Sequence, residues 1–323
     1  MLNFYYSFSL KKYLVEILLF LLSYYTCVFY TSTIIRVDYQ IAEYNLNQMK
    51  KICWIFDHNS VYQVLISFCS VIKNNPNETF HFYLIIPPNM TLNTENFSFF
   101  LNPKSKIEVR HFLWKHMERH PTPDETCYHP PLIIVKVFLF EILHEVDKVL
   151  YLDSDMINVR PISQIWETPM ENKTIGGTKR IHLTNTWINS GFIFYNLNFL
   201  RTRSKDLWRC QYLNSCIADD SWHTRCQKDD WVYFFPYRYN VDFYPMRVNM
   251  KRTKDQKNEE KNAVFYHVKD FSHIIYTVKN RSEIPSLYAV RRKKQIQNIF
   301  ENLFDFMQSV ELKIENNKKK KKV

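Results

Sequence analysis

Glycine is the residue this sequence lacks most clearly, with only three among its 323 positions. The phosphate-binding loops GxGxxG and GxxxxGK[ST] need several glycines at fixed spacing, and Gly176, Gly177 and Gly191 form neither pattern. This shortage argues against P-loop ATPases and against dehydrogenases that bind dinucleotides through such a loop. No pair of cysteines has CxxC spacing, so neither a zinc ribbon nor a thioredoxin-type redox site is expected.

Apolar and aromatic residues are abundant, at 46% and 16% of the chain. This content is enough for a substantial core and argues against a disordered protein. The formal charge is +11, from 43 Lys and Arg against 32 Asp and Glu. Much of the excess lies in two basic runs near the C-terminus, residues 291–294 and 318–322. Such runs are typical of solvated tails, so no nucleic-acid partner is expected.

Residues 13–35 form an apolar run long enough to cross a bilayer core of about 30 Å as a helix. Lys11 and Lys12 precede the run, which places the N-terminus in the cytosol by the positive-inside rule. The alternative is a cleaved signal peptide with its apolar part at residues 14–22, but no small-x-small cleavage site follows it. We therefore expect a signal anchor and a single-pass type II membrane protein, with the rest of the chain in the lumen of the secretory pathway.

The cysteines and glycosylation sequons agree with this topology without establishing it. Cys53 and Cys69 fall in apolar segments and are expected to be buried thiols. Cys210, Cys216 and Cys226 lie in a polar segment and are better disulfide candidates, although sequence alone cannot choose the pairing. The chain has five Asn-x-Ser/Thr sequons, which begin at Asn77, Asn89, Asn96, Asn172 and Asn280.

Hydrophobic patterning after the anchor predicts strands that alternate with helices. Strands are expected at 51–56, 80–86, 106–112, 148–152, 188–200, 243–245 and 263–268, helices at 61–73 and 132–143, and a charged loop at 251–262. This alternation predicts an α/β fold with a mostly parallel central sheet and helices on both faces. The chain then divides into a cytosolic tail (1–12), the transmembrane anchor (13–35), a stem (36–50), a catalytic domain (51–290) and a basic C-terminal helix and tail (291–323).

The sharpest chemical feature is Asp153-Ser154-Asp155, which directly follows an apolar strand. Alternate residues of a strand face the same side, so we expect both carboxylates to point together at the carboxyl edge of the sheet. Carboxylate pairs of this kind bind Mg²⁺ or Mn²⁺, ions that neutralise a departing diphosphate. The alternative is an ordinary turn or helix-capping pair, because a bare DxD occurs in many unrelated proteins. Asp57 ends another predicted strand and is expected at the same edge.

The segment Phe138–Trp166 resembles the signature of glycosyltransferase family 8, and especially its glucoside xylosyltransferase branch. The match comprises a Leu-rich helix, Glu145-Val146-Asp147, the DxD motif, Arg160-Pro161 and Ile165-Trp166. The resemblance extends roughly over residues 51–275. It implies a GT-A fold and a retaining transferase that depends on a UDP-sugar donor and on Mn²⁺ or Mg²⁺.

The resemblance also assigns roles to single residues. It implies that His267 is the third metal ligand beside Asp153 and Asp155, and that Asn249 lies on the acceptor side. Nucleotide-sugar contacts are implied for the positions that match family motifs, which are Asp57, Asn59, Lys136, Ser154, Asn189, Gly191 and Lys269. Glycine at position 191 permits close approach of the backbone, which is a physical reason for a glycine-poor chain to keep one there.

The chain departs from the family pattern at the segment that faces the reacting sugar. Lys228-Asp229-Asp230 stands where the family has Asp-Gln-Asp, and Asp229 and Asp230 are the catalytic candidates, as nucleophile or ion-pair stabiliser. The alternative is a structural role, in which the two acidic residues only cap a helix before Trp231. Val248 replaces a family tryptophan, and Lys269 follows His267 more closely than its family counterpart does.

The combined expectation is transfer of xylose from UDP-xylose, in α-1,3 linkage, to an O-linked glucose on a glycoprotein. The alternatives are a family 8 transferase that uses UDP-glucose or UDP-galactose, and an impaired lumenal protein that binds the nucleotide sugar without turnover. A metal-dependent phosphohydrolase is a weaker alternative, because it needs a second metal-ligand cluster that the sequence does not clearly offer.

Overall fold

The computed structural model describes residues 49–113, 131–179, 188–206, 226, 229–243, 254–268 and 298–309. Chain contacts divide the protein into two units, Met1–Met49 and Lys50–Val323, and every element below belongs to the second. The predicted tail, the anchor and nearly all of the stem lie outside the described residues. Among the residues that are described, no helix has the length and apolarity needed to cross a membrane.

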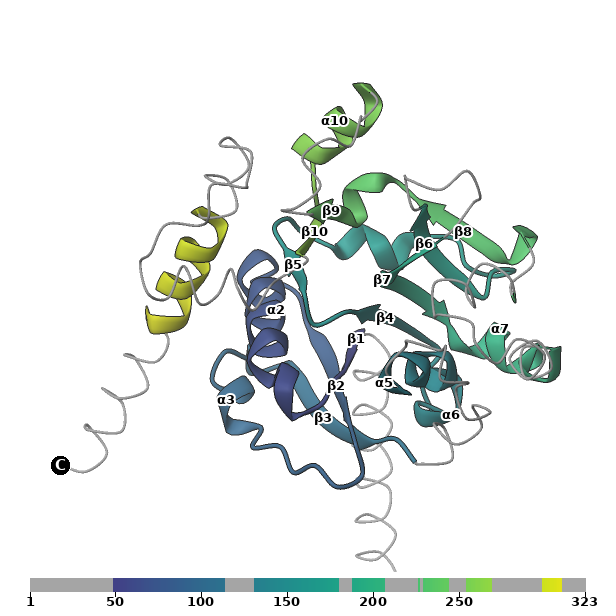
Figure 1. Ribbon diagram of the computed structural model, residues 1–323, viewed down its shortest axis with the longest axis horizontal. Coiled ribbons are helices and arrows are strands. Elements are labelled where there is room, and N and C mark those ends of the chain that lie inside the picture. The colour runs from purple at the N-terminus through teal and green to yellow at the C-terminus, as the bar shows by residue number, and fades with distance from the viewer. Residues whose placement is uncertain are drawn as a thin grey trace, which may run out of the picture. The chain divides into compact units, whose positions relative to one another are not determined.

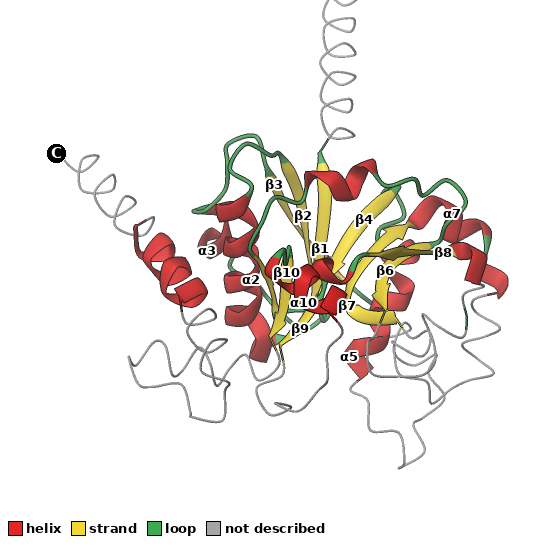
Figure 2. Cartoon of the chain, turned by 90° about the horizontal axis from the view of Figure 1, so that it is seen from above, coloured by secondary structure: helices red, strands yellow, loops and turns green. Residues whose placement is uncertain are grey.

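A seven-stranded sheet forms the centre of the fold, with strand order β3-β2-β1-β4-β7-β6-β8 (Figures 1 and 2). Its strands are β1 (Lys50–Ile55), β2 (Phe80–Ile86), β3 (Lys106–His111), β4 (Lys148–Leu152), β6 (Ile175–Lys179), β7 (Ile188–Asn196) and β8 (Val232–Phe235). The first four run parallel, and β6 and β8 are parallel to each other. Only β7 runs antiparallel to its neighbours, β4 and β6. The predicted α/β class and the mostly parallel sheet are therefore confirmed.

Helices cover both faces of this sheet, as predicted. Side chains alternate along each strand, so both faces carry apolar residues that pack against helices. On β1, Ile52 and Trp54 belong to the same core cluster as Phe68 of helix α2 (Val61–Asn74). The intervening Cys53 belongs to the cluster on the opposite face. That cluster includes the helical segment of α5 (Pro131–Ile134), η2 (Val135–Phe138) and α6 (Leu139–Ile142).

Further helices complete the described fold. They are η1 (His58–Ser60), α3 (Glu95–Ser98), η3 (Ser163–Glu167), α7 (Leu197–Thr202), η4 (Asp229–Trp231), η5 (Tyr237–Tyr239), α10 (Lys254–Lys261) and a helix at 298–309. The last of these joins the core cluster of α2 and α3 through Phe300, Leu303 and Met307.

A second, three-stranded sheet lies beside the first and has the order β5-β10-β9. Its strands are β5 (Met156–Asn158), β9 (Val241–Phe243) and β10 (Phe265–Val268). Strand β10 is antiparallel to β5 and parallel to β9, so His267 is in register with Met156 on one side and Asp242 on the other. This register brings a residue from late in the chain beside the turn that carries the DxD motif.

The strand expected at 243–245 is β9 at Val241–Phe243, with residues 244–245 outside the described range, and the strand expected at 263–268 begins at Phe265. Three further predicted elements differ from the structure. The helix expected at 132–143 is broken into α5, η2 and α6, in agreement with the poor helix propensity of its β-branched run at 133–135. The strand expected to reach residue 200 ends at Asn196, whose side chain accepts a hydrogen bond from the Phe199 amide and caps α7. The loop expected at 251–262 contains α10, because its Lys, Gln and Glu residues favour helix.

Candidate metal centre

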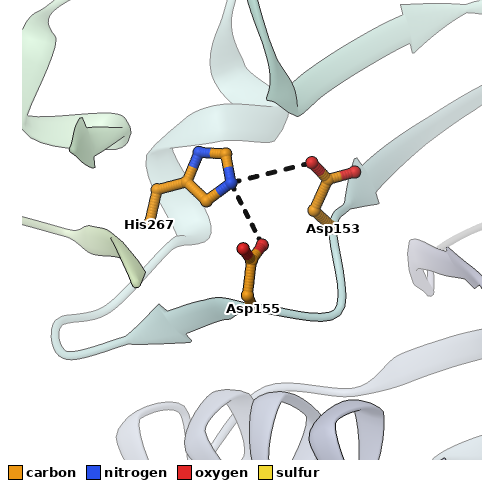
Figure 3. A group of neighbouring side chains, drawn as sticks. All are labelled: Asp153, Asp155 and His267. Carbon is orange, nitrogen blue, oxygen red and sulfur yellow. Dashed lines mark ion pairs between the residues drawn. The ribbon is translucent and has the colours of Figure 1, made fainter. Parts of the chain in front are cut away.

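Three side chains converge where the two sheets meet, and they are the ones expected to hold a metal ion. One potential ligand atom from each of Asp153, Asp155 and His267 lies within 4.8 Å of the others. The Nε2 atom of His267 is 3.0 Å from Asp155 Oδ1 and 3.7 Å from Asp153 Oδ2 (Figure 3). Two carboxylates and one imidazole nitrogen are ligands that suit a divalent cation. These three side chains are therefore suitable ligands for the Mg²⁺ or Mn²⁺ ion that the sequence predicts.

A turn, and not strand alternation, brings the two carboxylates together. Strand β4 ends at Leu152, as predicted, and Asp153 to Asp155 connect it to β5. The carboxylates do point together, but strand alternation is not the reason. The Asp153 amide donates to Gly191 O at 2.9 Å, and the Met156 amide donates to Asp153 O at 3.1 Å. The backbone carbonyl of Asp155 accepts from Val268 N at 2.9 Å, which ties the turn to β10.

Gly191 makes room for the imidazole of His267. A Cβ atom built on Gly191 would lie 2.4 Å from Cε1 of His267 and 2.8 Å from Nδ1, well inside contact distance. His267 itself is only 1% exposed, so its ring has little space into which to retreat. The expectation that position 191 needs glycine for close approach therefore has a specific cause here, which is the packing of His267 against β7.

Lys136 and Tyr151 surround the other side of Asp153. The Tyr151 hydroxyl donates to Asp153 Oδ1 at 2.6 Å, and the Lys136 ammonium lies 3.3 Å from the same oxygen. Lys136 is 3% exposed and also donates to the backbone carbonyl and hydroxyl of Ser190, at 3.3 and 3.2 Å. Its Nζ atom lies 4.8 Å from the Tyr151 ring centroid. The structure thus places a buried cation directly beside the first DxD carboxylate.

Asp242 is a buried acidic residue beside the site that the sequence did not bring out. It is 3% exposed, and its Oδ1 lies 3.8 Å from Nδ1 of His267. The Asn189 side-chain amide donates to the same oxygen at 2.8 Å. One feature of the sequence could have indicated Asp242. It is an acidic residue between two apolar ones in a strand-like segment, Val241-Asp242-Phe243. Its importance depends on the pairing of β9 with β10, which the sequence did not predict.

Three other predicted nucleotide-sugar residues lie in the segments that directly follow strands β1 and β4. Asp57 follows β1 and accepts a hydrogen bond from the Asn59 amide at 3.0 Å, capping η1. The Asn59 side chain donates to Asp57 Oδ2 at 3.3 Å. Ser154, between the two metal-site carboxylates, donates to Gln63 of α2 at 3.4 Å. Asp57 and Ser154 thus follow the carboxyl ends of the neighbouring strands β1 and β4, as expected for the rim.

The catalytic candidates are described only in part. Residues 229–231 form η4, and Asp230 is exposed, with its backbone carbonyl bound to Lys173 Nζ at 2.5 Å. Asn249, Lys269 and Lys228 lie outside the described residues, as do most of the cysteines in the polar segment. The one described cysteine of that segment, Cys226, is disulfide-bonded. Outside the segment, Cys53 and Cys69 carry buried free thiols, as predicted.

Comparisons with known proteins decide the family. The model of "Glycosyl transferase family 8" matches residues 43–268, which is more than half of the chain. The chain belongs to glycosyltransferase family 8. The motif Asp153-Ser154-Asp155 and His267 both fall inside the matched range, and no curated protein sequence matches the chain.

Solved structures agree on the fold. An active-site mutant of LgtC aligns with a TM-score of 0.53 and 18% identity, covering 68% of this chain and 87% of LgtC. Galactosyltransferase LgtC in complex with donor and acceptor sugar analogs gives 0.52 and 16%, with the same coverage. GlyE of Streptococcus pneumoniae TIGR4 gives 0.51 and 16%, covering 68% of this chain and 55% of GlyE. At these identities the likeness shows the GT-A-like fold of this glycosyltransferase and does not identify its sugars.

Proposed function

We propose that this family 8 enzyme is a retaining, metal-dependent transferase that moves xylose from UDP-xylose, in α-1,3 linkage, to an O-linked glucose on a glycoprotein. The proposal that the enzyme binds a metal ion and a nucleotide sugar rests on one observation. Asp153, Asp155 and His267 converge at the carboxyl edge of the sheet. The choice of xylose rests on the resemblance of Phe138–Trp166 to the glucoside xylosyltransferase branch. LgtC, which shares the fold, has been solved with donor and acceptor sugar analogs bound.

Each residue at the rim has a separate task in this proposal. Asp153, Asp155 and His267 hold the divalent cation, Mn²⁺ or Mg²⁺. When bound, such a cation neutralises negative charge on the diphosphate leaving group. The buried ammonium of Lys136 adds fixed positive charge at the same place, and the Tyr151 hydroxyl orients Asp153.

Most of the remaining predicted residues bind or face the two substrates. In this proposal Asp57, Asn59 and Ser154 lie on the nucleotide side and Gly191 lies beside the sugar and diphosphate, a role that the family resemblance also assigns to Lys269. The side chain of Asn189 points into the protein, toward Asp242, so it supports this side of the site without touching the donor. The family resemblance assigns Asn249 to the acceptor side. Asp229 or Asp230 stabilises positive charge at the anomeric carbon or attacks it as nucleophile, and either route retains the configuration.

Two alternatives on the same fold are kept. One is a UDP-glucose or UDP-galactose donor, because the galactosyltransferase LgtC has the same fold and the fold does not select the sugar. An impaired protein that binds the nucleotide sugar without turnover is favoured by Lys228, which replaces an acidic residue of the family pattern.

A donor comparison tests the proposal. We expect purified protein with Mn²⁺ to release UDP faster from UDP-xylose than from UDP-glucose or UDP-galactose, and faster still with a glucosylated acceptor. Asp153→Ala should abolish release from every donor, and Asp255→Ala, an exposed residue on α10, is the control. Release that is slowest from UDP-xylose would refute the branch assignment, and Mn²⁺-dependent UDP binding without turnover would support the impaired alternative.

For the compartment, we propose a type II protein of the Golgi or endoplasmic reticulum membrane with a lumenal catalytic domain. The disulfide at Cys226 supports an oxidising compartment. The described sequon asparagines are all exposed, so folding does not hide them from glycosylation; they are Asn77, Asn89, Asn96 and Asn172. Protein from secretory-pathway expression should shift in mass on treatment with peptide N-glycosidase F. An unchanged mass together with cytosolic fractionation would refute the lumenal placement.

A further inference from the structure

The ring of His267 is held on three sides, and each side has a different partner. Its Nε2 atom faces Asp155 and Asp153, and its Cε1 atom lies against Gly191. Its Nδ1 atom faces the buried carboxylate of Asp242, at 3.8 Å from Oδ1. Nε2 and Nδ1 are the two nitrogens of the ring, so the arrangement assigns one nitrogen to the ion and the other to Asp242.

The position of Asp242 follows from backbone pairing. Strands β9 and β10 run parallel, with Asp242 in register with His267. Asp242 is 3% exposed, and a carboxylate in such a place is costly unless polar groups compensate it. The compensation includes the Asn189 amide, which donates at 2.8 Å.

Asn189 is itself fixed, so it can hold Asp242 in one orientation. Its Oδ1 accepts from the Gly191 amide at 3.3 Å, and its backbone carbonyl accepts from the Asn240 side chain at 3.3 Å. The side chain of Asn189 is therefore committed to the interior, toward Asp242. This differs from the direct contact with the donor sugar that the family resemblance implies for it.

We propose that Asp242 is a positioning residue for the metal ligand His267, and that Asn189 holds Asp242 in place. A carboxylate beside Nδ1 favours the tautomer with its proton on Nδ1, which leaves the Nε2 lone pair directed at the ion. Gly191 supplies the space that lets the ring occupy this position. The inference rests on the proposed metal site and adds to it the residues that prepare its third ligand.

Manganese affinity of the full chain tests this role without an activity assay. Free Mn²⁺ is measured by electron paramagnetic resonance for wild type, Asp242→Ala and Asp242→Asn. We expect Asp242→Ala to weaken Mn²⁺ binding by about 10–100-fold, the usual cost of losing a partner behind a metal ligand. Asp242→Asn keeps a polar oxygen facing Nδ1 at the same place, so it should lose less. This isosteric variant keeps the test valid if the alanine variant does not fold.

Asn158→Ala is the matched control. Asn158 is a buried polar residue of β5 that bonds Asn75 and the Val264 carbonyl, so its loss weakens the same small sheet without touching the imidazole. We expect a similar fall in melting temperature with unchanged Mn²⁺ affinity. If Asn158→Ala lost as much affinity as Asp242→Ala, the effect of Asp242 would be general destabilisation and the proposal would be overturned.

The outcomes separate this inference from the proposed function. Wild type that does not bind Mn²⁺ refutes the metal site and, with it, the role of Asp242. Wild type that binds Mn²⁺ while both Asp242 variants bind equally well refutes only the positioning role. A second readout is the ¹⁵N spectrum of His267 in Mg²⁺-loaded protein. It should show protonated Nδ1 in wild type and a changed tautomer in Asp242→Ala, and protonated Nε2 in wild type would contradict the proposal.

Discussion

Two polar clusters lie around β5 and β10, one fully buried and one partly open to solvent, and they are built in opposite ways. The amide cluster, comprising Ser70, Asn75 and Asn158, is neutral and tightly bonded. The charged cluster comprises Lys136, Asp153, Asp155, Asp242 and His267. Within the amide cluster the side-chain bonds are close to 3 Å, with Asn75 to Asn158 at 3.0 Å and the Asn158 amide to Ser70 at 2.9 Å. In the other cluster the separations between charged side chains run from 3.0 Å to 3.8 Å.

The difference indicates what each cluster is for. Asn75 and Asn158 satisfy backbone groups of Ile162 and Val264, so the amide cluster fastens α2 to the small sheet. The charged cluster holds three carboxylates with one lysine and one histidine. Carboxylates this close repel one another unless a cation lies among them. We therefore infer that the amide cluster stabilises the packing of α2 against the small sheet. The charged cluster is a binding site, and the same small sheet holds its His267 in place.

The largest effect should come from placing a charge in the neutral cluster. In Asn158→Asp, a carboxylate oxygen replaces the amide nitrogen that donates to Arg160 O and Val264 O at 2.8 and 3.0 Å. An unpaired buried charge facing two carbonyls should lower the free energy of unfolding by about 3–5 kcal/mol. Chemical denaturation measures this loss. A loss below that of Asn158→Ala would show that the amide cluster tolerates charge, and the comparison would fail.

The next effect should come from Gly191→Ala, which fills the space occupied by the His267 ring. A new Cβ at 2.4 Å from Cε1 must displace the imidazole or β7. Overpacking of this kind costs about 1–3 kcal/mol. Denaturation should show this cost, and titration should show weakened Mn²⁺ binding. Gly176→Ala, which overpacks Phe235, is the matched control and should destabilise the fold while leaving Mn²⁺ affinity intact. Unchanged binding in Gly191→Ala would contradict the account.

Asp155→Asn separates binding from folding most cleanly. Without metal, losing one partly exposed carboxylate should change the free energy of unfolding by less than about 1 kcal/mol. Wild type with Mn²⁺ at 100 times its dissociation constant should gain about 2.7 kcal/mol by mass action, and the variant should gain much less. Thermal melts with and without Mn²⁺ measure both. An equal Mn²⁺-dependent gain in the variant would remove Asp155 from the site.

The smallest effect concerns His81, a histidine beside a carboxylate but outside both clusters. Burial lowers the pKa of His81, although Glu108, at 3.0 Å from Nε2, opposes the shift. The unfolded chain therefore takes up a proton on this histidine at higher pH than the folded chain does. Stability should fall slightly as pH drops through the ordinary histidine pKa of about 6.5. His81→Gln should flatten this slope in pH-dependent melts, and an unaltered slope would exclude His81 as its source.

Strands β1, β2 and β4 could be predicted from the sequence because they are largely buried on both faces and read as apolar runs, and β3 could be predicted because its apolar and polar side chains alternate. Strands β6 and β8 were not predicted. The segments predicted for β1, β2, β3 and β4 match the observed strands to within a residue. The predicted end of β7 was wrong because the Asn196 side chain caps α7. The loop predicted at 251–262 was wrong because helix propensity forms α10 there.

The metal residues could be predicted only in part from local pattern. Asp153 and Asp155 stand out as a DxD motif at the end of a predicted strand, but a turn aligns them, and strand alternation does not. His267 was identified through family resemblance, because a single histidine on a strand carries no specific signal. Asp242 was missed because its role depends on its register with His267, a pairing between residues distant in sequence. Contacts of that kind are fixed by tertiary structure.

Anomalous scattering from crystals grown with Mn²⁺ and UDP tests the central claim most directly. The account predicts a manganese peak at about 2.0–2.3 Å from one oxygen each of Asp153 and Asp155 and from Nε2 of His267, with diphosphate oxygens completing the coordination. A manganese ion bound elsewhere, or a diphosphate seated away from these three side chains, would contradict it.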